Sequence, residues 1–363
     1  MVEEGDLMSE NQVEEAPGAN LEKPLARILG IESSCDETAA SVVENGREIL
    51  SSAVASQVDL HAQFGGIFPE VASRQHILSI YPIVDQALKD AHLKLSDLDG
   101  IAVTRGPGLP GSLVVGINMA KGLAIGSGLP LLGINHLEGH LYSAWLEEEG
   151  KKKKKVPKFP LLALIVSGGH TELILMKDHL SYERLGGTLD DAAGEAFDKV
   201  ARLLELGYPG GPVIQEAALS GDPKAFDFPR SWLDDTFNFS FSGLKTSVLR
   251  TVQQLEKQKS KLPKGDLAAS FQAAVVDVLF QKTLRAAEDF NTKDILIAGG
   301  VSANQALRDK FKGQKRYSVH IPPLSLCTDN AAMIAGAGCF RFHAGQRDSL
   351  DMDAAPTWSI SDL

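Results

Sequence analysis

Short apolar runs alternate with amphipathic patterns along most of the chain. Residues 27–31 form an apolar run, which is followed by a polar turn over 32–38 and a second apolar run over 39–43. The same order of apolar run, small polar turn and apolar run recurs over 161–176. Each unit predicts two strands joined by a turn, and their repetition predicts an internal duplication.

Helices and further strands are predicted between and after these units. Apolar residues three and four positions apart predict helices, and short apolar runs bounded by turn residues predict buried strands. Such alternation is typical of an α/β fold. The predicted helices cover residues 75–91, 113–125, 136–145, 189–206, 211–220, 265–287, 304 onward and 329–343. The further predicted strands cover 101–103, 131–134, 295–298 and 319–322.

Two segments stand apart from this alternation. Residues 1–26 are acidic and lack aromatic side chains, so we predict a disordered tail. Residues 147–159 combine charges of both signs with Gly and Pro, which is typical of a surface loop that links domains. The tail lacks the basic and apolar regions of a secretory signal, and no apolar run is long enough to span a membrane.

Charge and cysteine content narrow the class of protein. The 363 residues include 36 Lys and Arg against 47 Asp and Glu, which gives a net charge of −11. This balance excludes a protein whose whole surface binds nucleic acid or anionic membrane, but it allows a local basic patch such as Lys151–Lys155. Three cysteines without a CxxC pair predict a reducing compartment rather than a disulfide framework.

The strongest local signal for chemistry is the pair His136 and His140. Histidines four residues apart lie on one face of a helix and can bind one metal ion. Asp329 is a candidate third ligand, and a His/His/carboxylate set suits Fe²⁺ or Zn²⁺. Zincin proteases need a glutamate directly after the first histidine, where this chain has Leu137. A metal site is therefore predicted, with two unliganded histidines as the alternative, and zincin proteolysis is disfavoured.

The two polar turns predict a second kind of site. The first turn offers hydroxyl groups and the carboxylates of Asp36 and Glu37, and the second, over 167–171, offers Gly-rich backbone N–H groups. Glycine allows the backbone to close on phosphate oxygens, and a carboxylate can position a cation or a nucleophile. The strand that ends in Gly299 and Gly300 before a helix leaves room for a flat ligand. The alternative for each turn is an ordinary hairpin.

Taken together, these motifs resemble the TsaD family, the universal tRNA N6-adenosine threonylcarbamoyltransferases. The resemblance covers about residues 28–345, and two of its motifs, CTDNAAMIA and VSGGHT, are most similar to the bacterial and organellar branch. Ser33 stands where threonine is common in the family, and Gln215 stands where an acidic residue is frequent in other branches. The motifs in chain order are GIESSCDETAASVV, GGIFPEVASRQH, GPGLPGSLVVGINMAKGLA, INHLEGHLYSAWL, VSGGHTELI, LDDAAGEAFDKVARLL, YPGGP, FSFSGLKT, AGGVSANQALR and CTDNAAMIAGAG.

The resemblance implies a fold and a reaction. The fold is actin-like, as in sugar kinases and Hsp70-type ATPases, with two duplicated α/β domains around a central cleft. The first domain would comprise residues 27–146 and 330–363, and the second residues 160–329. The enzyme would transfer the threonylcarbamoyl group from threonylcarbamoyl-AMP to N6 of the adenosine that follows the anticodon in tRNAs reading ANN codons, with release of AMP.

The resemblance also implies site residues. One divalent metal ion, Fe²⁺ in preference to Zn²⁺, would be held by His136, His140 and Asp329. The predicted catalytic acids are Asp36 and Glu37. The predicted substrate-binding residues are Ile165, Val166, Ser167, Gly168, Gly169, Asp198, Gly211, Gln215 and Asn304.

Partners follow from the same resemblance. In the bacterial branch, such enzymes act with an inactive actin-fold paralogue and a small P-loop ATPase, while a separate enzyme makes the intermediate. We therefore expect a cytoplasmic protein that binds tRNA and threonylcarbamoyl-AMP and does not bind a membrane. Two other activities remain open at this point: an acetate- or sugar-kinase-like phosphotransferase of the same fold and, less favoured, a metallopeptidase.

Overall fold

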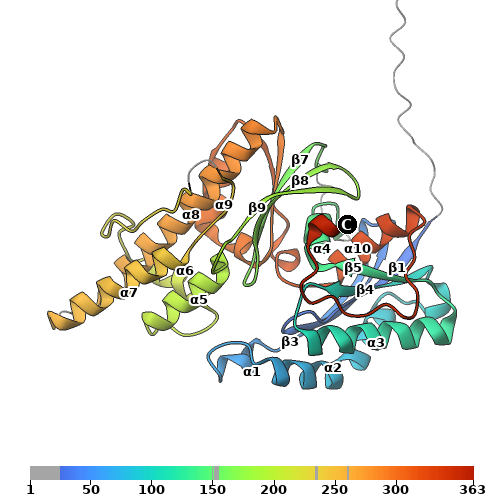
Figure 1. Cartoon of the computed structure of the whole chain (residues 1–363). Helices are drawn as coiled ribbons and strands as arrows, with labels where there is room; N and C mark the ends of the chain where they lie inside the picture. The colour runs from blue at the N-terminus through green and yellow to red at the C-terminus, as the bar shows by residue number, and fades with distance from the viewer. Residues whose placement is uncertain (1–24, 149, 151–154, 234–235, 260) are drawn as a thin grey trace, which may run out of the picture.

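Two mixed β-sheets form the framework of the structure (Figure 1). The first has the strand order β5-β4-β1-β2-β3-β6, with β1 (Arg27–Glu32), β2 (Glu37–Glu44), β3 (Glu48–Ser56), β4 (Gly100–Gly106), β5 (Leu131–Asn135) and β6 (Glu147–Glu148). The second has the order β11-β10-β7-β8-β9, with β7 (Leu161–Val166), β8 (Thr171–Asp178), β9 (Ser181–Gly187), β10 (Asp294–Ala298) and β11 (Ser318–His320). This computed structural model describes residues 25–148, 150, 155–233, 236–259 and 261–363, so the predicted tail over 1–26 lies outside them apart from its last two residues.

The two sheets share one topology. In each, three antiparallel strands (β1-β2-β3 or β7-β8-β9) are extended on one side by two parallel strands (β4 and β5, or β10 and β11). Among the described residues, β6 is the one additional strand, and it pairs in parallel with β3. The predicted α/β class and internal duplication are therefore confirmed.

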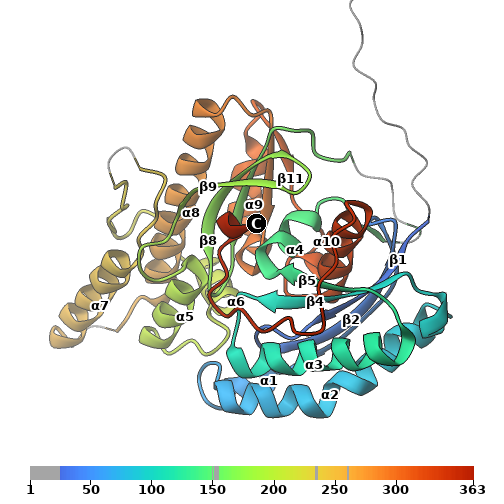
Figure 2. The ribbon, with the colours of Figure 1, turned by 45° about the vertical axis from the view of Figure 1, so that its right-hand side comes forward.

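The helices form three layers around the two sheets (Figures 1 and 2). One layer packs on the outer face of the first sheet, a second lies between the sheets, and a third covers the outer face of the second sheet. No described helix combines the length and the apolar character that a membrane crossing needs. The α-helices are α1 (Val58–Ala62), α2 (Pro69–Asp90) and α3 (Pro110–Ser127) in the first layer, α4 (His136–Tyr142) and α10 (Ala331–His343) in the second, and α5 (Ala193–Leu203), α6 (Gly210–Ala218), α7 (Ser242–Lys257), α8 (Lys264–Asp289) and α9 (Gln305–Gly313) in the third. Four 3-10 turns lie at Leu95–Asp97, Gly300–Ala303, Leu324–Leu326 and Ile360–Asp362.

The middle layer, α4 and α10, is buried on both sides. One apolar core joins side chains of the first sheet, both helices and the second sheet. Small residues let α10 approach β1 closely: a Cβ atom on Gly30 would lie 2.3 Å from the carbonyl oxygen of Ala331 and 2.6 Å from the backbone nitrogen of Ala335. After α10 the chain first runs beside the first sheet, where Asp348 bridges to Leu131, and its last turn, Ile360–Asp362, contacts β9. The bounds of the two domains remain predictions.

A buried ion pair ties the middle layer to the second sheet. The carboxylate of Glu138 in α4 is fully buried and accepts a hydrogen bond of 2.8 Å from Nε of Arg341 in α10. Its other oxygen accepts a hydrogen bond of 2.7 Å from the hydroxyl group of Tyr182 in β9. Because an unpaired charge in the core is costly, these contacts hold α4, α10 and β9 in one arrangement.

Some elements differ from the sequence-based expectations. The helix predicted from residue 189 begins at Ala193, because Asp190 accepts a hydrogen bond of 2.8 Å from the backbone N–H of Phe241 and the residues before α5 form a turn. The predicted loop over 147–159 begins with strand β6, and residues 149 and 151–154 lie outside the described residues. Strands β3 and β9 were not predicted, because they are more exposed than the inner strands and lack a continuous apolar run.

We predict that Gly30→Ala destabilises the protein, because the added methyl group must displace α10 from β1. Overpacking of this kind costs about 1–3 kcal/mol of unfolding free energy. Urea unfolding followed by circular dichroism measures the change. Gly122→Ala in α3 is the control, since no described atom beyond its chain neighbours and the backbone of its own helix lies within 4 Å of its Cβ position, and it should stabilise the protein by about 0.5–1 kcal/mol. Equal unfolding midpoints for the two variants would contradict the close approach of α10.

We also predict that Arg341→Met lowers the free energy of unfolding by about 3–5 kcal/mol, because it leaves the carboxylate of Glu138 buried without its cation. The control is Arg316→Met, which removes the exposed pair with Glu288 and should change the free energy of unfolding far less, because water screens this pair. The same urea experiment compares them. A loss for Arg341→Met as small as that of the control would show that the pair does not hold the layers together.

Candidate active site between the two sheets

A cavity of about 840 Å³ lies between the two halves of the molecule. Its walls include the residues that follow β1, β4, β5, β7 and β10, so it is formed at the carboxyl ends of these strands. Open α/β sheets bind ligands at this position. Both predicted turns reach the cavity, through Ser34–Glu37 from the first and Ser167–His170 from the second. The duplication therefore supplies one turn from each half to a single site.

Several helices begin at this cavity. Leu109 precedes α3, Gly194 and Gly211 lie in the first turns of α5 and α6, and Asn304 is the N-cap of α9. Helix N-termini carry partial positive charge and free N–H groups, and both favour a bound anion. No Lys or Arg is found among the described residues that line the cavity. An anion held here would thus depend on backbone N–H groups and on a bound cation.

The three predicted metal ligands lie together at one wall. Their ligating atoms all fall within 4.8 Å of one another. Nε2 of His136 lies 3.4 Å from Oδ1 of Asp329, and Nε2 of His140 lies 3.3 Å from the same oxygen. The side chain of Asn135 fixes the start of α4 by accepting a hydrogen bond of 2.9 Å from the N–H of Leu137, and one helix face then carries both histidines.

The chemistry of these residues fits a divalent metal ion. Both ring nitrogens of His140 are buried, and neither forms a hydrogen bond with a described residue. A buried imidazole in this condition is costly unless a ligand satisfies it. The separations of 3.3 and 3.4 Å also suit neighbouring ligands that share one small cation at about 2.1 Å. Two imidazoles and one carboxylate are a donor set for iron or zinc.

The carboxylate of Glu32 positions the imidazole ring of His136. Its Oε2 lies 2.9 Å from Nδ1 of His136 and also accepts a hydrogen bond of 2.7 Å from the hydroxyl group of Thr104. A carboxylate at Nδ1 fixes the tautomer that directs Nε2 toward a metal. Burial disfavours a charged imidazole, but Asp329 and Glu32 outweigh it and raise the pKa of His136 well above its ordinary value. The surroundings of this ring thus favour positive charge.

The two predicted catalytic acids, Asp36 and Glu37, both line the cavity. Burial and the negative charges of Asp36 and Asp329 raise the pKa of Glu37 to about 10. The Glu37 carboxyl group therefore keeps its proton at neutral pH, while its Oε1 accepts a hydrogen bond of 3.2 Å from the hydroxyl group of Ser56. In this environment Glu37 is a hydrogen-bond donor rather than a base.

Not all predicted substrate-binding residues reach the cavity. The side chains of Ile165 and Val166 are fully buried in the cores on opposite faces of β7 and do not line it. Gln215 lines it, but its Oε1 already accepts a hydrogen bond of 2.7 Å from the N–H of Gln305. Asp198 accepts one of 2.7 Å from the N–H of Gly210. The predicted residues that line the cavity are Ser167, Gly168, Gly169, Asp198, Gly211, Gln215 and Asn304.

Other lining residues were not among the predicted site residues. His170 follows Gly169 in the second turn, and burial together with the charges of His136 and His140 lowers its pKa to about 4, so it is neutral near pH 7. A histidine next to two glycines in a turn is a signal that could have identified it. Cys35 also lines the cavity, but burial raises its pKa well above the ordinary value, and the thiol is therefore a poor nucleophile. Tyr208 forms part of the wall without a distinguishing local pattern.

Comparison with solved structures identifies the fold. Component A of (R)-2-hydroxyglutaryl-CoA dehydratase from Acidaminococcus fermentans is similar with a TM-score of 0.51 and 16% identity, covering 88% of this chain and 99% of that one. HypF from T. kodakarensis has a TM-score of 0.58 and 15% identity, covering 88% of this chain and 48% of that one. At such identities the likeness shows the fold alone. The predicted actin-like fold, with two duplicated domains around a cleft, is confirmed.

Comparison of sequences identifies the family. The TsaD family, described as tRNA N6-adenosine threonylcarbamoyltransferase, matches residues 48–336. The enzyme of that name from Dehalococcoides mccartyi is 54% identical over 335 residues, which cover 92% of this chain and 99% of that protein. The enzyme of the same name from Thermomicrobium roseum is 54% identical over 345 residues, which cover 90% of this chain and 94% of that protein. That from Listeria welshimeri is 53% identical over 342 residues, which cover 93% of this chain and 97% of that protein. The chain therefore belongs to the TsaD family of tRNA N6-adenosine threonylcarbamoyltransferases.

Proposed function

We propose that the cavity between the two sheets is where the threonylcarbamoyl group passes from threonylcarbamoyl-AMP to tRNA. The acceptor is N6 of the adenosine that follows the anticodon in tRNAs reading ANN codons, and AMP is released. The observation that carries this proposal is the meeting of a buried His/His/Asp group with two polar turns in one cavity of about 840 Å³. Family membership supports this transfer over the kinase-like and peptidase activities that the residues alone left open.

The Gly-rich turn at Gly168 and Gly169 supports binding of the phosphate group of the intermediate, as do the helix N-termini that meet at the cavity. Gly168 and Gly169 line the cavity, and neither backbone N–H donates a hydrogen bond to a described residue. A Cβ atom at either position would meet nothing within 4 Å, so the ligand side of this turn is open. In this proposal the two N–H groups hold oxygen atoms on which negative charge develops during the transfer.

Another part of the cavity lining suits the adenosine part of the intermediate. Tyr208, Pro212 and Val301 offer flat or apolar surface, and Asp198 has one oxygen free of hydrogen bonds with described residues. Asn304 is committed to α9, because its Oδ1 accepts from the N–H of Leu307 and its Nδ2 donates to Gln272. We therefore assign the polar contact with the adenosine to Asp198 in preference to Asn304.

His136, His140 and Asp329 would hold one divalent ion, with Fe²⁺ favoured over Zn²⁺. When bound, such an ion acts as a Lewis acid and as a template that orients an anionic substrate. The absence of Lys and Arg from the described lining supports this assignment, since no other full positive charge faces the phosphate group. Glu32 would keep His136 in the ligating tautomer.

The protein residues would act mainly by positioning the two reactants. The amino group at N6 of adenosine is a weak nucleophile, so holding it in line with the carbonyl carbon supplies much of the rate enhancement. Because Glu37 keeps its proton at neutral pH, it would donate a hydrogen bond to the substrate. We propose Asp36, which lines the same cavity, as the group that accepts the proton lost from N6.

We predict that His140→Ala abolishes both metal binding and transfer. Cells depleted of this protein should lose threonylcarbamoyladenosine from their tRNA, and a plasmid copy of the native sequence should restore it. The His140→Ala copy should give less than about a hundredth of the native level, since even residues that only support metal ligands contribute about 10–100-fold. Nucleoside analysis measures the modification, and metal analysis of the purified chain measures iron and zinc.

The control is His92→Ala, which changes an exposed histidine outside the cavity. It should restore the modification fully and keep the metal. Threonylcarbamoyladenosine that persists after depletion would refute the proposed function. Full restoration by His140→Ala would refute the metal assignment while leaving the function standing.

We also propose that an inactive actin-fold paralogue binds to helix α2 and that a small P-loop ATPase joins the complex in the cytoplasm. Ile77, Leu78 and Tyr81 of α2 are 62%, 70% and 68% exposed and lie on the side that faces away from the first sheet. An exposed group of large apolar side chains is typical of a protein interface. The three cysteines are free thiols, which suits a reducing compartment.

We predict that Leu78→Asp weakens binding of the paralogue by at least about 30-fold, because a charge buried among apolar contacts costs about 2 kcal/mol or more. Leu219→Asp is the matched control, since it places the same charge at an apolar side chain that is 76% exposed in the other half of the molecule. Calorimetry with the purified paralogue measures both affinities. Equal affinities for the two variants would exclude α2 as the interface.

A further inference from the structure

Positive charge is concentrated at the end of α7 and in the segment that follows it. Residues 250–264 include five Lys and Arg but one acidic residue, Glu256, in a chain with a net charge of −11. Arg250, Lys257, Lys259 and Lys261 are exposed. None of these four forms an ion pair with a described residue. Like charges this close repel one another, so the cluster does not stabilise the fold by itself.

Several cations elsewhere in the same half of the molecule are paired. Lys199 and Lys245 both contact Asp191, and Arg230 contacts Asp277. These pairs hold the turn before α5 and the outer helices together. Lys257, Lys259 and Lys261 form no such pair with a described residue, so their charges remain available to bind another molecule, whereas Lys264 pairs with Glu205.

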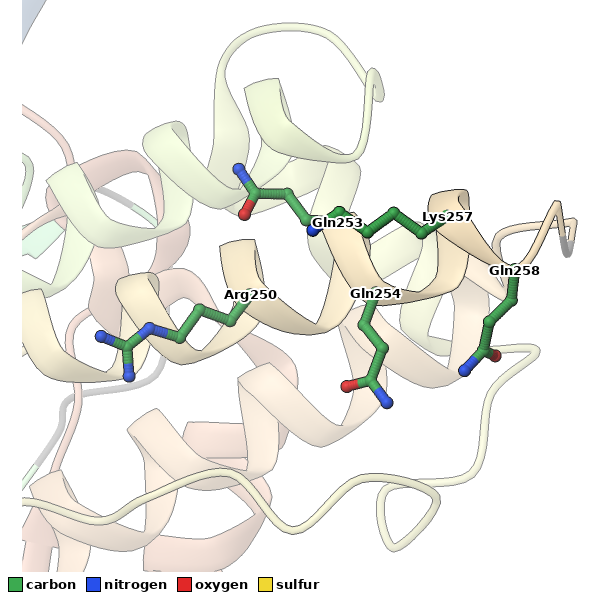
Figure 3. A pocket seen from close by; sticks show the side chains of 5 residues that line it. All are labelled: Arg250, Gln253, Gln254, Lys257 and Gln258. Atoms are coloured by element: carbon green, nitrogen blue, oxygen red, sulfur yellow. The ribbon is translucent and has the colours of Figure 1, made fainter.

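The side chains at this end of α7 form one continuous strip. Figure 3 shows Arg250, Gln253, Gln254, Lys257 and Gln258, which line a shallow depression of about 350 Å³. Their spacing of three and four residues places them on one side of the helix. We call these five residues, together with Lys259 and Lys261, the α7 basic strip.

The chemistry of the α7 basic strip fits a nucleic acid backbone. Lysine and arginine bind phosphate groups, and glutamine amides donate to phosphate oxygens and bond with ribose hydroxyl groups. Among the described residues, no aromatic or large aliphatic side chain lines the depression. The strip therefore lacks the apolar anchors on which protein interfaces depend.

The position of α7 means that only a large ligand could reach both the cavity and the α7 basic strip. α7 packs against α5, whose first turn lines the cavity, and its far end points away from the cleft at the edge of the molecule (Figures 1 and 2). A small nucleotide in the cavity cannot also contact the strip. A folded RNA with one adenosine in the cavity extends far enough to do so.

We propose that the α7 basic strip binds the phosphate backbone of the tRNA whose adenosine is modified in the cavity. This rests on the proposed function, because it takes tRNA as the substrate. The contact is sequence-independent and contributes to affinity for tRNA rather than to the chemical step.

The test compares two variants with the same loss of charge, in the full chain assembled with its partner proteins. The first is Lys257→Gln/Lys259→Gln/Lys261→Gln in the strip. The control is Lys94→Gln/Lys224→Gln/Lys293→Gln, three exposed lysines elsewhere that form no ion pair with a described residue. Filter binding to unmodified tRNA at several salt concentrations gives affinity and salt dependence, and transfer at saturating tRNA gives kcat.

The strip variant should bind tRNA at least about tenfold more weakly at low salt, and the slope of log affinity against log salt should fall by about 2–3 units, or about one for each lost phosphate contact. The control should change affinity less than about twofold, and both variants should keep the native kcat. Equal affinities for the two variants would overturn the proposal. So would a strip variant that loses a partner protein while its affinity for tRNA is unchanged, since the occupant would then be an acidic protein. Because kcat at saturating tRNA is measured separately, either failure would leave the proposed function intact.

Discussion

The packing of α4 and α10 between the two sheets is the constraint on which the site depends. Most side chains of a layer that is buried on both faces must be apolar, and the layer must fit closely between the sheets. Small residues allow this close fit where Gly30 of β1 meets Ala331 of α10. The same layer carries the predicted metal ligands, since α4 holds both histidines and Asp329 precedes α10. The buried Glu138–Arg341 pair then fixes how the two helices lie against each other. The same layer therefore determines both how the core between the sheets packs and where the three predicted metal ligands lie.

The charges of the molecule divide into two surfaces with opposite character. The cavity collects carboxylates and helix N-termini but no Lys or Arg among its described lining, so small anions there need N–H groups and a cation. Full positive charges without partners instead gather at the far end of α7. This division separates recognition of the reacting group from attraction of a large polyanion. A net charge of −11 therefore does not conflict with a nucleic acid substrate.

The sequence allowed the framework of the site to be predicted because its signals are local. Two turns between apolar strands, and two histidines at helical spacing, need no knowledge of distant contacts. Glu32 was not predicted as a support for His136, because their contact joins the end of β1 to the start of α4, about a hundred residues further along the chain. Gln215 likewise is engaged with the start of α9, far along the chain. Ile165 and Val166 illustrate another limit, since motif position suggested ligand contact whereas an apolar strand buries both side chains.

The chain's return to the first sheet has a consequence for how the protein is made. Asp329 follows all of β7 to β11, so a ribosome must synthesise the whole second sheet before the third ligand can join His136 and His140. Until α10 docks, the inner face of the first sheet and the apolar side of α4 lack their cover. Contacts between such distant segments form late and slowly. The proposed metal site is therefore complete only after the second sheet has been synthesised, and a shorter chain lacks its third predicted ligand.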